Sequence, residues 1–180
     1  MKDSMTVEQV QHLLGFLGHY QGAIRDEWGR EAQAACRAFQ QQEGLAADGI
    51  PGPKTQQALR QAVARKRQGD TWQKTPNFTR SEFACKCGCG FDQIDLELVA
   101  LCQKLRDRFG VPVVISSGCR CPEHNRRVGG KVNSRHLLGR AVDFSVSGHP
   151  AAEVLPLARQ LSGIRYAYQI DEHYLHMDIG

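Results

Sequence analysis

The sequence predicts an α+β protein, in which a small three-helix N-terminal domain precedes a mixed α+β domain with a central antiparallel sheet. Two observations favour this fold class. Apolar residues recur at helical spacing in the first part of the chain, whereas the second part combines one such helix with short apolar or alternating runs typical of strands. A chain of 180 residues is long enough to bury the cores of two small domains.

The N-terminal domain is expected to span residues 1–64. Its first helix is predicted by apolar residues at helical spacing, followed by Gly18 as a stop: Val10, Leu13, Leu14 and Leu17. A second helix is predicted near 31–41, and a third after Thr55, ending near Ala64. Turn segments rich in Asp, Gly and Pro lead into the second and third helices, which gives a weak internal repeat of turn and helix.

Residues 65–77 are rich in Lys, Arg, Gln, Gly and Thr, and we expect a linker there. The second domain is expected to span 78–180. Its first long helix is predicted over 94–109 and stops at Gly110. The elements expected after it are a buried strand at 111–115, an alternating strand at 141–146, a helix near 151–161, and terminal strands at 164–170 and 174–179.

Charge and hydropathy exclude some partners. The formal net charge of +4 is a mild excess that favours approach to an anionic polymer. The only dense basic run lies in the expected linker, so no nucleic-acid partner is expected. No apolar run is long enough to cross a membrane, and the first residues do not resemble a secretory signal. We therefore expect a monomer that is made in the cytoplasm and does not insert into a membrane.

Three side chains in the second domain have the composition of a catalytic zinc site. Such sites commonly take three protein ligands and leave one position to water. His136, Asp143 and His176 would supply two imidazoles and one carboxylate. Asp143 lies on an otherwise apolar strand, where an unpaired charge is costly, so it needs a cation or several hydrogen bonds. The spacing alone leaves an alternative open, in which Asp143 pairs with an arginine and His176 is an ordinary half-buried histidine.

Separated motifs add a family resemblance. The segment 117–125, the glycines after Val128, the Ser-x-His-x-x-Gly-x-Ala-x-Asp run at 134–143 and the final His176-Met177-Asp178 closely resemble the D-alanyl-D-alanine carboxypeptidase family of zinc peptidases. The resemblance covers the chain from about Phe78 to its end. That family shares its fold with the hedgehog signalling domain and includes phage endolysins and vancomycin-resistance dipeptidases. The resemblance implies one catalytic zinc ion held by the three side chains named above.

The same resemblance implies a role for Arg120, the arginine of the Ser-Gly-x-Arg motif, which faces the substrate in this family. Its guanidinium could grip a carboxylate or a polarised carbonyl oxygen. The alternative is a structural pairing with Glu123 or Asp143. Asp178 follows the last ligand closely enough to orient a zinc-bound imidazole.

The general base is the position where this sequence departs from the family. Better-known members carry an acid three residues before the last zinc histidine, and His173 stands there. In a regular strand Glu172 would share the face of His176, whereas a bulge could bring in His173 or Asp171. We expect Glu172 and His173 together to serve as the base.

The N-terminal domain resembles the three-helix peptidoglycan-binding module found beside many wall hydrolases. The distinctive part is the Asp-Gly-Ile-x-Gly-Pro-x-Thr run at 48–55, with supporting matches at 10–14, 39–40 and 58–59. The resemblance implies peptidoglycan as the partner. Tyr20, Trp28 and Asp48 are the candidate groove residues, although aromatic residues in so small a unit are also typical of a core. The turn at 26–29 is a shortened version of the family pattern.

The seven cysteines are an odd number, so at least one thiol stays free or pairs with another chain. Cys85, Cys87 and Cys89 could form a second metal site, with Cys119 or Cys121 adding a ligand. We favour packing thiols, or disulfides formed after release into an oxidising space, because the catalytic site already accounts for the metal. A redox or metal-storage role for the cysteines is a further alternative.

Together these features predict a zinc-dependent peptidase that hydrolyses an amide bond in the stem peptide or crosslink of bacterial cell wall. The expected context is a phage or prophage endolysin, made without a signal peptide and acting on the wall after release, with endopeptidase activity favoured. The alternatives are a D-alanyl-D-alanine carboxypeptidase of the host wall and a non-catalytic zinc-containing module that binds wall.

Overall fold

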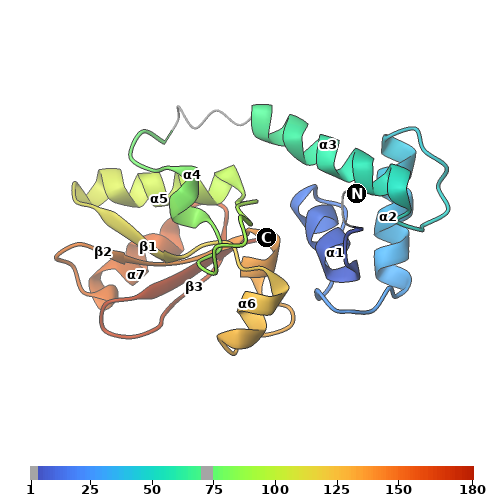
Figure 1. Cartoon of the computed structure of the whole chain (residues 1–180). Coiled ribbons are helices and arrows are strands. Elements are labelled where there is room, and N and C mark those ends of the chain that lie inside the picture. Colours follow the sequence, from blue (N-terminus) through green and yellow to red (C-terminus); the bar gives the residue numbers. More distant parts are fainter. Residues whose placement is uncertain (1–3, 70–74) are drawn as a thin grey trace.

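The computed structural model describes residues 4–69 and 75–180. Its N-terminal unit consists of α1 (Val7–Phe16), α2 (Arg30–Gln42) and α3 (Pro53–Gly69), as the sequence predicts (Figure 1). α1 begins with a capping box, in which the Thr6 hydroxyl accepts from the Gln9 backbone N–H and the Gln9 side chain accepts from the Thr6 N–H. Both bonds satisfy amides that a helix start leaves without a partner.

The third helix is longer than the sequence analysis expects. Residues 65–69, assigned there to the linker, continue α3, and 70–74 lie outside the described residues. The extension has partners in its own unit, since Lys66 Nζ donates to the Phe16 carbonyl at 2.7 Å and Arg65 pairs with Glu43. These contacts secure the last turns of α3 against the other two helices, which composition alone does not reveal.

The second unit is a mixed α+β structure built on one four-stranded antiparallel sheet of order β1-β2-β4-β3. This confirms the predicted fold class. The strands are β1 (Val113–Ser117), β2 (Ala141–Val146), β3 (Ile164–Gln169) and β4 (Leu175–Ile179). The helical elements are α4 (Arg80–Phe83), α5 (Leu96–Phe109), α6 (Pro122–Arg127), the short 3₁₀ helix η2 (Arg135–Leu138) and α7 (Ala151–Gln160).

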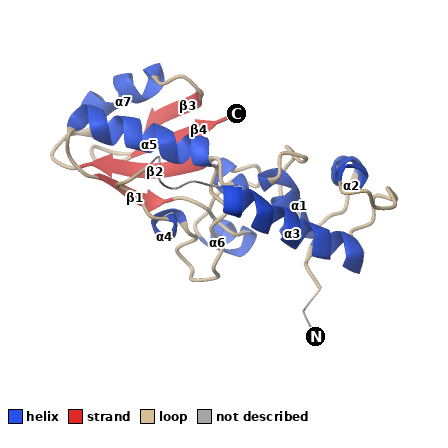
Figure 2. Cartoon of the chain, turned by 90° about the horizontal axis from the view of Figure 1, so that it is seen from above, coloured by secondary structure: helices blue, strands red, loops and turns tan. Residues whose placement is uncertain are grey.

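The two faces of the sheet have different roles. Alternate residues of β2 and β4 point into one apolar core with α5 and α7: Val142, Phe144, Val146, Leu175, Met177 and Ile179. Figure 2 shows both helices lying along the sheet. α5 ends at Gly110 in the left-handed conformation (φ 68°), as the sequence predicts. The opposite face therefore carries the intervening residues, Asp143 and His176 among them.

The two units are in contact through α1. Leu137 and Leu138 of η2 belong to the apolar cluster of the N-terminal helices, and a Cβ on Gly15 would lie 2.5 Å from Leu138 Cδ2, so glycine permits this approach. His12 is fully buried edge-on to Phe91, with ring centroids 3.6 Å apart. α1 thus supports the segment that contains His136. No helix among the described residues is both long and apolar enough to span a membrane.

Candidate metal centre

His136, Asp143 and His176 meet on the polar face of the sheet. Asp143 on β2 pairs in register with His176 on β4, and η2 brings His136 beside them. Asp143 Oδ1 lies 2.8 Å from His176 Nδ1 and 3.2 Å from His136 Nε2. All three residues are buried, with 2%, 9% and 8% of the surface of His136, Asp143 and His176 exposed. The structure thus brings the three predicted ligands together.

The second nitrogen of each imidazole has its own partner. His136 Nδ1 donates to the Gly118 carbonyl at 2.7 Å, so Nε2 is the nitrogen that faces Asp143. His176 Nε2 lies 3.2 Å from Asp178 Oδ2, which leaves its Nδ1 facing the cluster. Asp178 is held in turn by Arg165, whose Nε donates to Oδ1 at 2.7 Å and whose Nη2 donates to Oδ2 at 3.1 Å. Partners of this kind fix the tautomer and orientation of metal-binding histidines, and Asp178 lies where the sequence analysis places it.

The donor set suits a zinc ion. A ligand atom from each residue lies within 4.8 Å of the others. Tetrahedral zinc with nitrogen and oxygen ligands at about 2.1 Å separates those ligands by about 3.4 Å. Burial would raise the pKa of Asp143, but hydrogen bonds from His136 and His176 outweigh it and hold that pKa below its ordinary range. A buried carboxylate kept ionised between two imidazoles is the arrangement that a divalent cation requires.

Arg120 reaches the same cluster from the turn before α6. Its Nη2 donates to Asp143 Oδ2 at 2.5 Å, and its Nε donates to Ser117 Oγ at 2.8 Å. Of the two structural pairings considered from the sequence, the structure contains the one with Asp143. Arg120 also lines the cavity described next, so the carboxylate fixes its guanidinium beside the space that a substrate would enter.

A cavity of about 590 Å³ opens over the cluster, and we call it the metal cavity. Its wall includes basic side chains from a loop, η2 and β3, namely Lys131, Arg135 and Arg165. Tyr168 stacks on His176, with ring centroids 4.7 Å apart and planes at 25°. The sequence analysis missed Tyr166 and Tyr168. The sequence could reveal them only if the alternation of side chains along β3 were combined with the pairing of β3 and β4, in which Tyr168 lies opposite His176.

Comparison with known proteins identifies this domain. Residues 76–178 match the family model described as "Peptidase M15". The chain belongs to the peptidase M15 family. Residues 4–59 match the model described as "Putative peptidoglycan binding domain". The chain is also similar to the "Zinc D-Ala-D-Ala carboxypeptidase" of Streptomyces albus G, at 33% identity over 148 residues. That alignment covers 76% of this chain and 55% of the relative, so the chain spans about half the length of that protein.

These matches confirm both resemblances and support zinc as the cofactor of the M15 domain. Four residues are expected to form the zinc-peptidase site, and all four lie inside the matched segment: Arg120, His136, Asp143 and His176. Their individual roles stay predictions, which the geometry supports through the distances given above.

The structure does not bring the expected base to the M15 site. Glu172 and His173 lie in the turn between β3 and β4, with 83% and 68% of their side-chain surfaces exposed. His173 lines a separate cavity beside Ser145 and His149. The expectation placed Glu172 on the face of His176 if the backbone was regular there, or His173 or Asp171 if it formed a bulge. Instead Asp171 Oδ1 accepts from the backbone N–H groups of His173 and Tyr174, which closes a turn and ends the alternation.

The candidate groove residues of the N-terminal unit have internal partners. The Tyr20 hydroxyl donates to the Ala23 carbonyl at 2.7 Å, and Trp28 Nε1 donates to the Gly49 carbonyl at 3.0 Å. Asp48 Oδ1 accepts from the Ile50 N–H, which lowers the pKa of Asp48 and closes the turn at 48–50. Trp28 and Asp48 therefore make structural contacts with the turn at 48–50, which belongs to the run that resembles the peptidoglycan-binding module.

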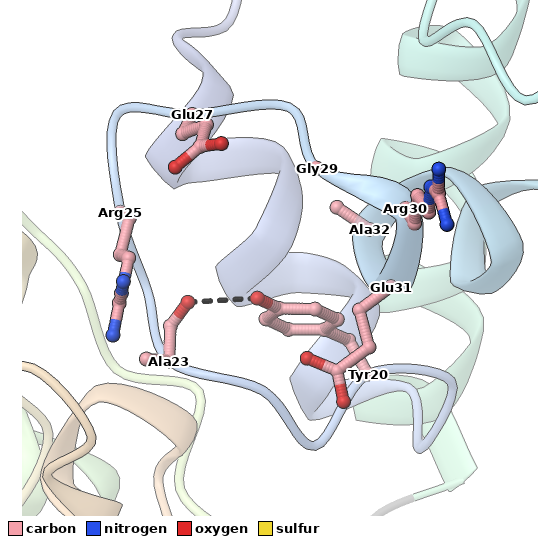
Figure 3. Close-up of a pocket in the computed structure, with 8 residues that line it drawn as sticks. All are labelled: Tyr20, Ala23, Arg25, Glu27, Gly29, Arg30, Glu31 and Ala32. Carbon is pink, nitrogen blue, oxygen red and sulfur yellow. Dashed lines mark hydrogen bonds between the residues drawn. The ribbon is translucent and has the colours of Figure 1, made fainter.

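A cavity of about 320 Å³ lies on this unit, and Tyr20 forms one wall (Figure 3). Its other lining residues are Ala23, Arg25, Glu27, Gly29, Arg30, Glu31 and Ala32. Of the three predicted groove residues, only Tyr20 is among the residues that line it. The remaining lining residues come from the loop before α2, which includes the shortened turn at 26–29, and from the first turn of α2.

Proposed function

We propose that the protein is a zinc-dependent peptidase that hydrolyses an amide bond in the peptide part of bacterial cell wall. The observation that carries this proposal is the buried cluster of His136, Asp143 and His176 at the metal cavity of an M15 domain. The peptidoglycan-binding match in the same chain supports the substrate class, as does the name of the Streptomyces relative.

A zinc ion in the cluster supplies a Lewis acid and lowers the pKa of a bound water to about 7. The chain's own groups do the rest. Arg120 is fixed by Asp143 and Ser117 beside the cavity, so its donors stabilise negative charge that develops on the scissile carbonyl oxygen. Tyr168 stacks on His176 and faces the same cavity, and its neutral hydroxyl is a second donor for that oxygen.

The proton carrier is proposed from the metal cavity itself, since Glu172 and His173 lie in another part of the surface. Among the described lining residues the carboxylates are Asp143 and Asp178, and both have cationic or imidazole partners. Tyr168 has an exposed ring and lies beside a ligand, and burial raises the pKa of its hydroxyl, so it is the best-placed group to give a proton to the leaving amine and then to regain one from solvent. Tyr168→Phe is expected to lower kcat with little change in KM.

For the bond, we propose cleavage within the stem peptide or crosslink. A binding module that keeps the enzyme on a polymer raises its effective concentration at internal bonds as well as at ends. A second candidate is removal of a terminal D-alanine, which is favoured by the relative's name and by cationic groups in the cavity that suit a carboxylate. Product masses from purified wall fragments separate them: free D-alanine as the sole product would reject internal cleavage.

We further propose that the protein is a phage or prophage endolysin, on the ground that a wall-binding module and a wall peptidase occur in one chain. Expression inside a bacterium should then cause lysis only after the membrane is permeabilised. Wall damage without permeabilisation would instead support a host enzyme that is exported.

Hydrolysis itself is tested by zymography on wall material with chelator and zinc add-back. Clearing that disappears with chelator and returns with zinc supports the proposal. A non-catalytic wall-binding module, the remaining alternative, would clear nothing under any condition.

A further inference from the structure

Four cysteines form a second cluster outside the metal cavity: Cys85, Cys87, Cys89 and Cys121. Their sulfur atoms all lie within 4.8 Å of one another. The distances between Sγ atoms are 3.4 Å from Cys85 to Cys87 and 3.7 Å from Cys87 to Cys121. All four are free thiols. We call this group the four-cysteine cluster.

These spacings match a metal rather than a pair of disulfides. Four sulfurs at about 2.3 Å from a tetrahedral zinc ion lie about 3.8 Å from each other. Two disulfides would instead require two separate pairs of sulfur atoms, each about 2.05 Å apart. Here Cys87 is close to two different sulfurs, from Cys85 in its own loop and Cys121 in a distant segment. One shared centre explains both approaches.

The backbone is arranged to present the sulfurs. The loop that carries three of them is closed by hydrogen bonds from Gly88 N–H to the Cys85 carbonyl and from Cys85 N–H to the Phe91 carbonyl. Gly88 and Gly90 have φ values of 79° and 78°, a conformation that a side chain would strain. The loop can therefore turn twice within six residues and aim neighbouring cysteines at one point.

Backbone amides also donate to the sulfurs. Cys121 N–H donates to Cys85 Sγ at 3.3 Å, and His124 N–H donates to Cys121 Sγ at 3.4 Å, where Cys121 caps the start of α6. These two amides therefore help to fix the sulfur atoms of Cys85 and Cys121 in position within the cluster.

We propose that Cys85, Cys87, Cys89 and Cys121 bind a second, structural zinc ion. Thiolates at tetrahedral spacing select zinc over harder cations, and four protein ligands leave no position for a reacting water. This is the metal site that the sequence left open as an alternative, in place of the packing thiols or disulfides that were favoured there. It also decides the fourth ligand: Cys119 is buried in the core of the M15 domain, and Cys121 faces the cluster.

The ion would connect two segments that position the catalytic site. The cysteine loop precedes α5, whereas Cys121 directly follows Arg120. Arg120 N–H donates to the His136 carbonyl at 3.0 Å, and the Gly118 carbonyl orients the His136 ring. Gly118 also packs closely against the backbone of Phe83, since a Cβ on Gly118 would lie 2.4 Å from the Phe83 carbonyl oxygen. Zinc in the four-cysteine cluster therefore fixes the turn that contains Arg120, a consequence that rests on the proposed function.

The test uses the full chain, purified with a reductant and without chelator. Metal analysis should find two zinc ions per chain. After replacement by cobalt, a thiolate-to-cobalt charge-transfer band should appear, since only the four-cysteine cluster offers thiolates to the metal. Cys85→Ser with Cys121→Ser should remove that band and one zinc ion. Cys36→Ala, a buried thiol outside the cluster, should keep both.

The wild-type chain alone provides a second measurement in case the double variant does not fold. A thiol reagent should modify the four cysteines slowly before chelation and rapidly after it. Three results would each overturn the proposal. The chain could bind a single zinc ion that His176→Ala abolishes, it could give no cobalt–thiolate band, or its mass could show disulfides in the reduced preparation. Because these readouts do not involve wall hydrolysis, they fail or succeed independently of the proposed function.

Discussion

The two clusters of proposed metal ligands differ in their donor atoms and in how the fold supports them. Asp143 and His176 lie on paired central strands, His136 joins them from η2, and together they offer nitrogen and oxygen atoms below a cavity. The four-cysteine cluster lies on loops and offers only sulfur. Three ligands with an open side are typical of catalytic zinc, and four closed ligands are typical of structural zinc. The comparison teaches that ligand number and type, more than proximity, distinguish the two roles.

The supports also differ. The sheet register holds Asp143 opposite His176, and buried Asp178 holds the imidazole from behind. The cysteine loop has few such contacts of its own, so a metal contributes more to its order. Loss of metal should therefore abolish chemistry at the first cluster and loosen structure at the second.

His176→Ala removes a ligand of the first cluster and should have the largest effect. Loss of the Lewis acid costs several kcal/mol of transition-state stabilisation, which corresponds to a rate lower by roughly 1000-fold or more. Hydrolysis of wall fragments measures it, with His173→Ala as the matched control. The control should keep nearly full activity, because its side chain is exposed in the turn before β4. An equally inactive control would restore His173 as the base.

Cys85→Ser with Cys121→Ser should act on stability instead. A structural zinc site adds its binding free energy to folding, so we expect the free energy of unfolding to fall by about 3 kcal/mol. Denaturant unfolding of the M15 domain measures it. Activity remaining in the folded fraction should exceed that of His176→Ala. If the double variant unfolds like the wild type, the second cluster contributes no structural metal.

Arg120→Lys keeps the positive charge but loses the planar fork that bridges Asp143 and Ser117. The expected result is a kcat lower by about 100-fold, the scale of one lost oxyanion donor, with zinc content unchanged. Steady-state kinetics on a soluble wall peptide, together with metal analysis, would show it. A change in KM alone would assign Arg120 to substrate binding only.

Asp178→Asn weakens the partner of His176 without removing a ligand. Outer partners of this kind are worth about 10- to 100-fold in metal affinity. Competition with a chelator of known affinity should show weaker zinc binding, whereas the cobalt–thiolate band of the other cluster stays. Equal losses at both clusters would mean that the variant disturbs the whole domain.

His12 tests the contact that α1 makes with the second unit through Phe91. Burial lowers the pKa of His12 well below its ordinary value, and neither ring nitrogen has a hydrogen-bond partner among the described residues. Below pH about 6.5 the unfolded chain takes up a proton that the folded chain refuses, so stability falls by up to about 1.4 kcal/mol per pH unit as pH decreases. Thermal unfolding from pH 7.5 to 5 should show less of this slope in His12→Phe. His173→Gln, on the exposed turn, should retain the wild-type slope.

Much of the fold could be predicted because it depends on local patterns. The repeat in α5 with Gly110 after it, and the alternation of β2, follow from helix and strand geometry. The grouping of His136, Asp143 and His176 could also be predicted, because the family resemblance implies it and because Asp143 between apolar neighbours needs a partner. These signals are contained within short segments of the sequence.

What could not be predicted depends on contacts between distant segments. Tyr168 reaches the metal cavity only because β3 pairs with β4 in one register. Glu172 misses it because Asp171 closes a tight turn just before β4, which leaves Glu172 exposed. Likewise α1 meets η2, and Cys121 meets the cysteine loop, through packing between units and loops that no local period encodes.

The most direct test of the central claim is wall hydrolysis by the metal-free chain during stepwise zinc addition, with bound metal counted at each step. The account predicts no hydrolysis without metal, recovery as the cluster of His136, Asp143 and His176 fills, and no recovery in His176→Ala even though that variant still binds zinc. Full hydrolysis by the metal-free chain, or recovery in His176→Ala, would contradict it.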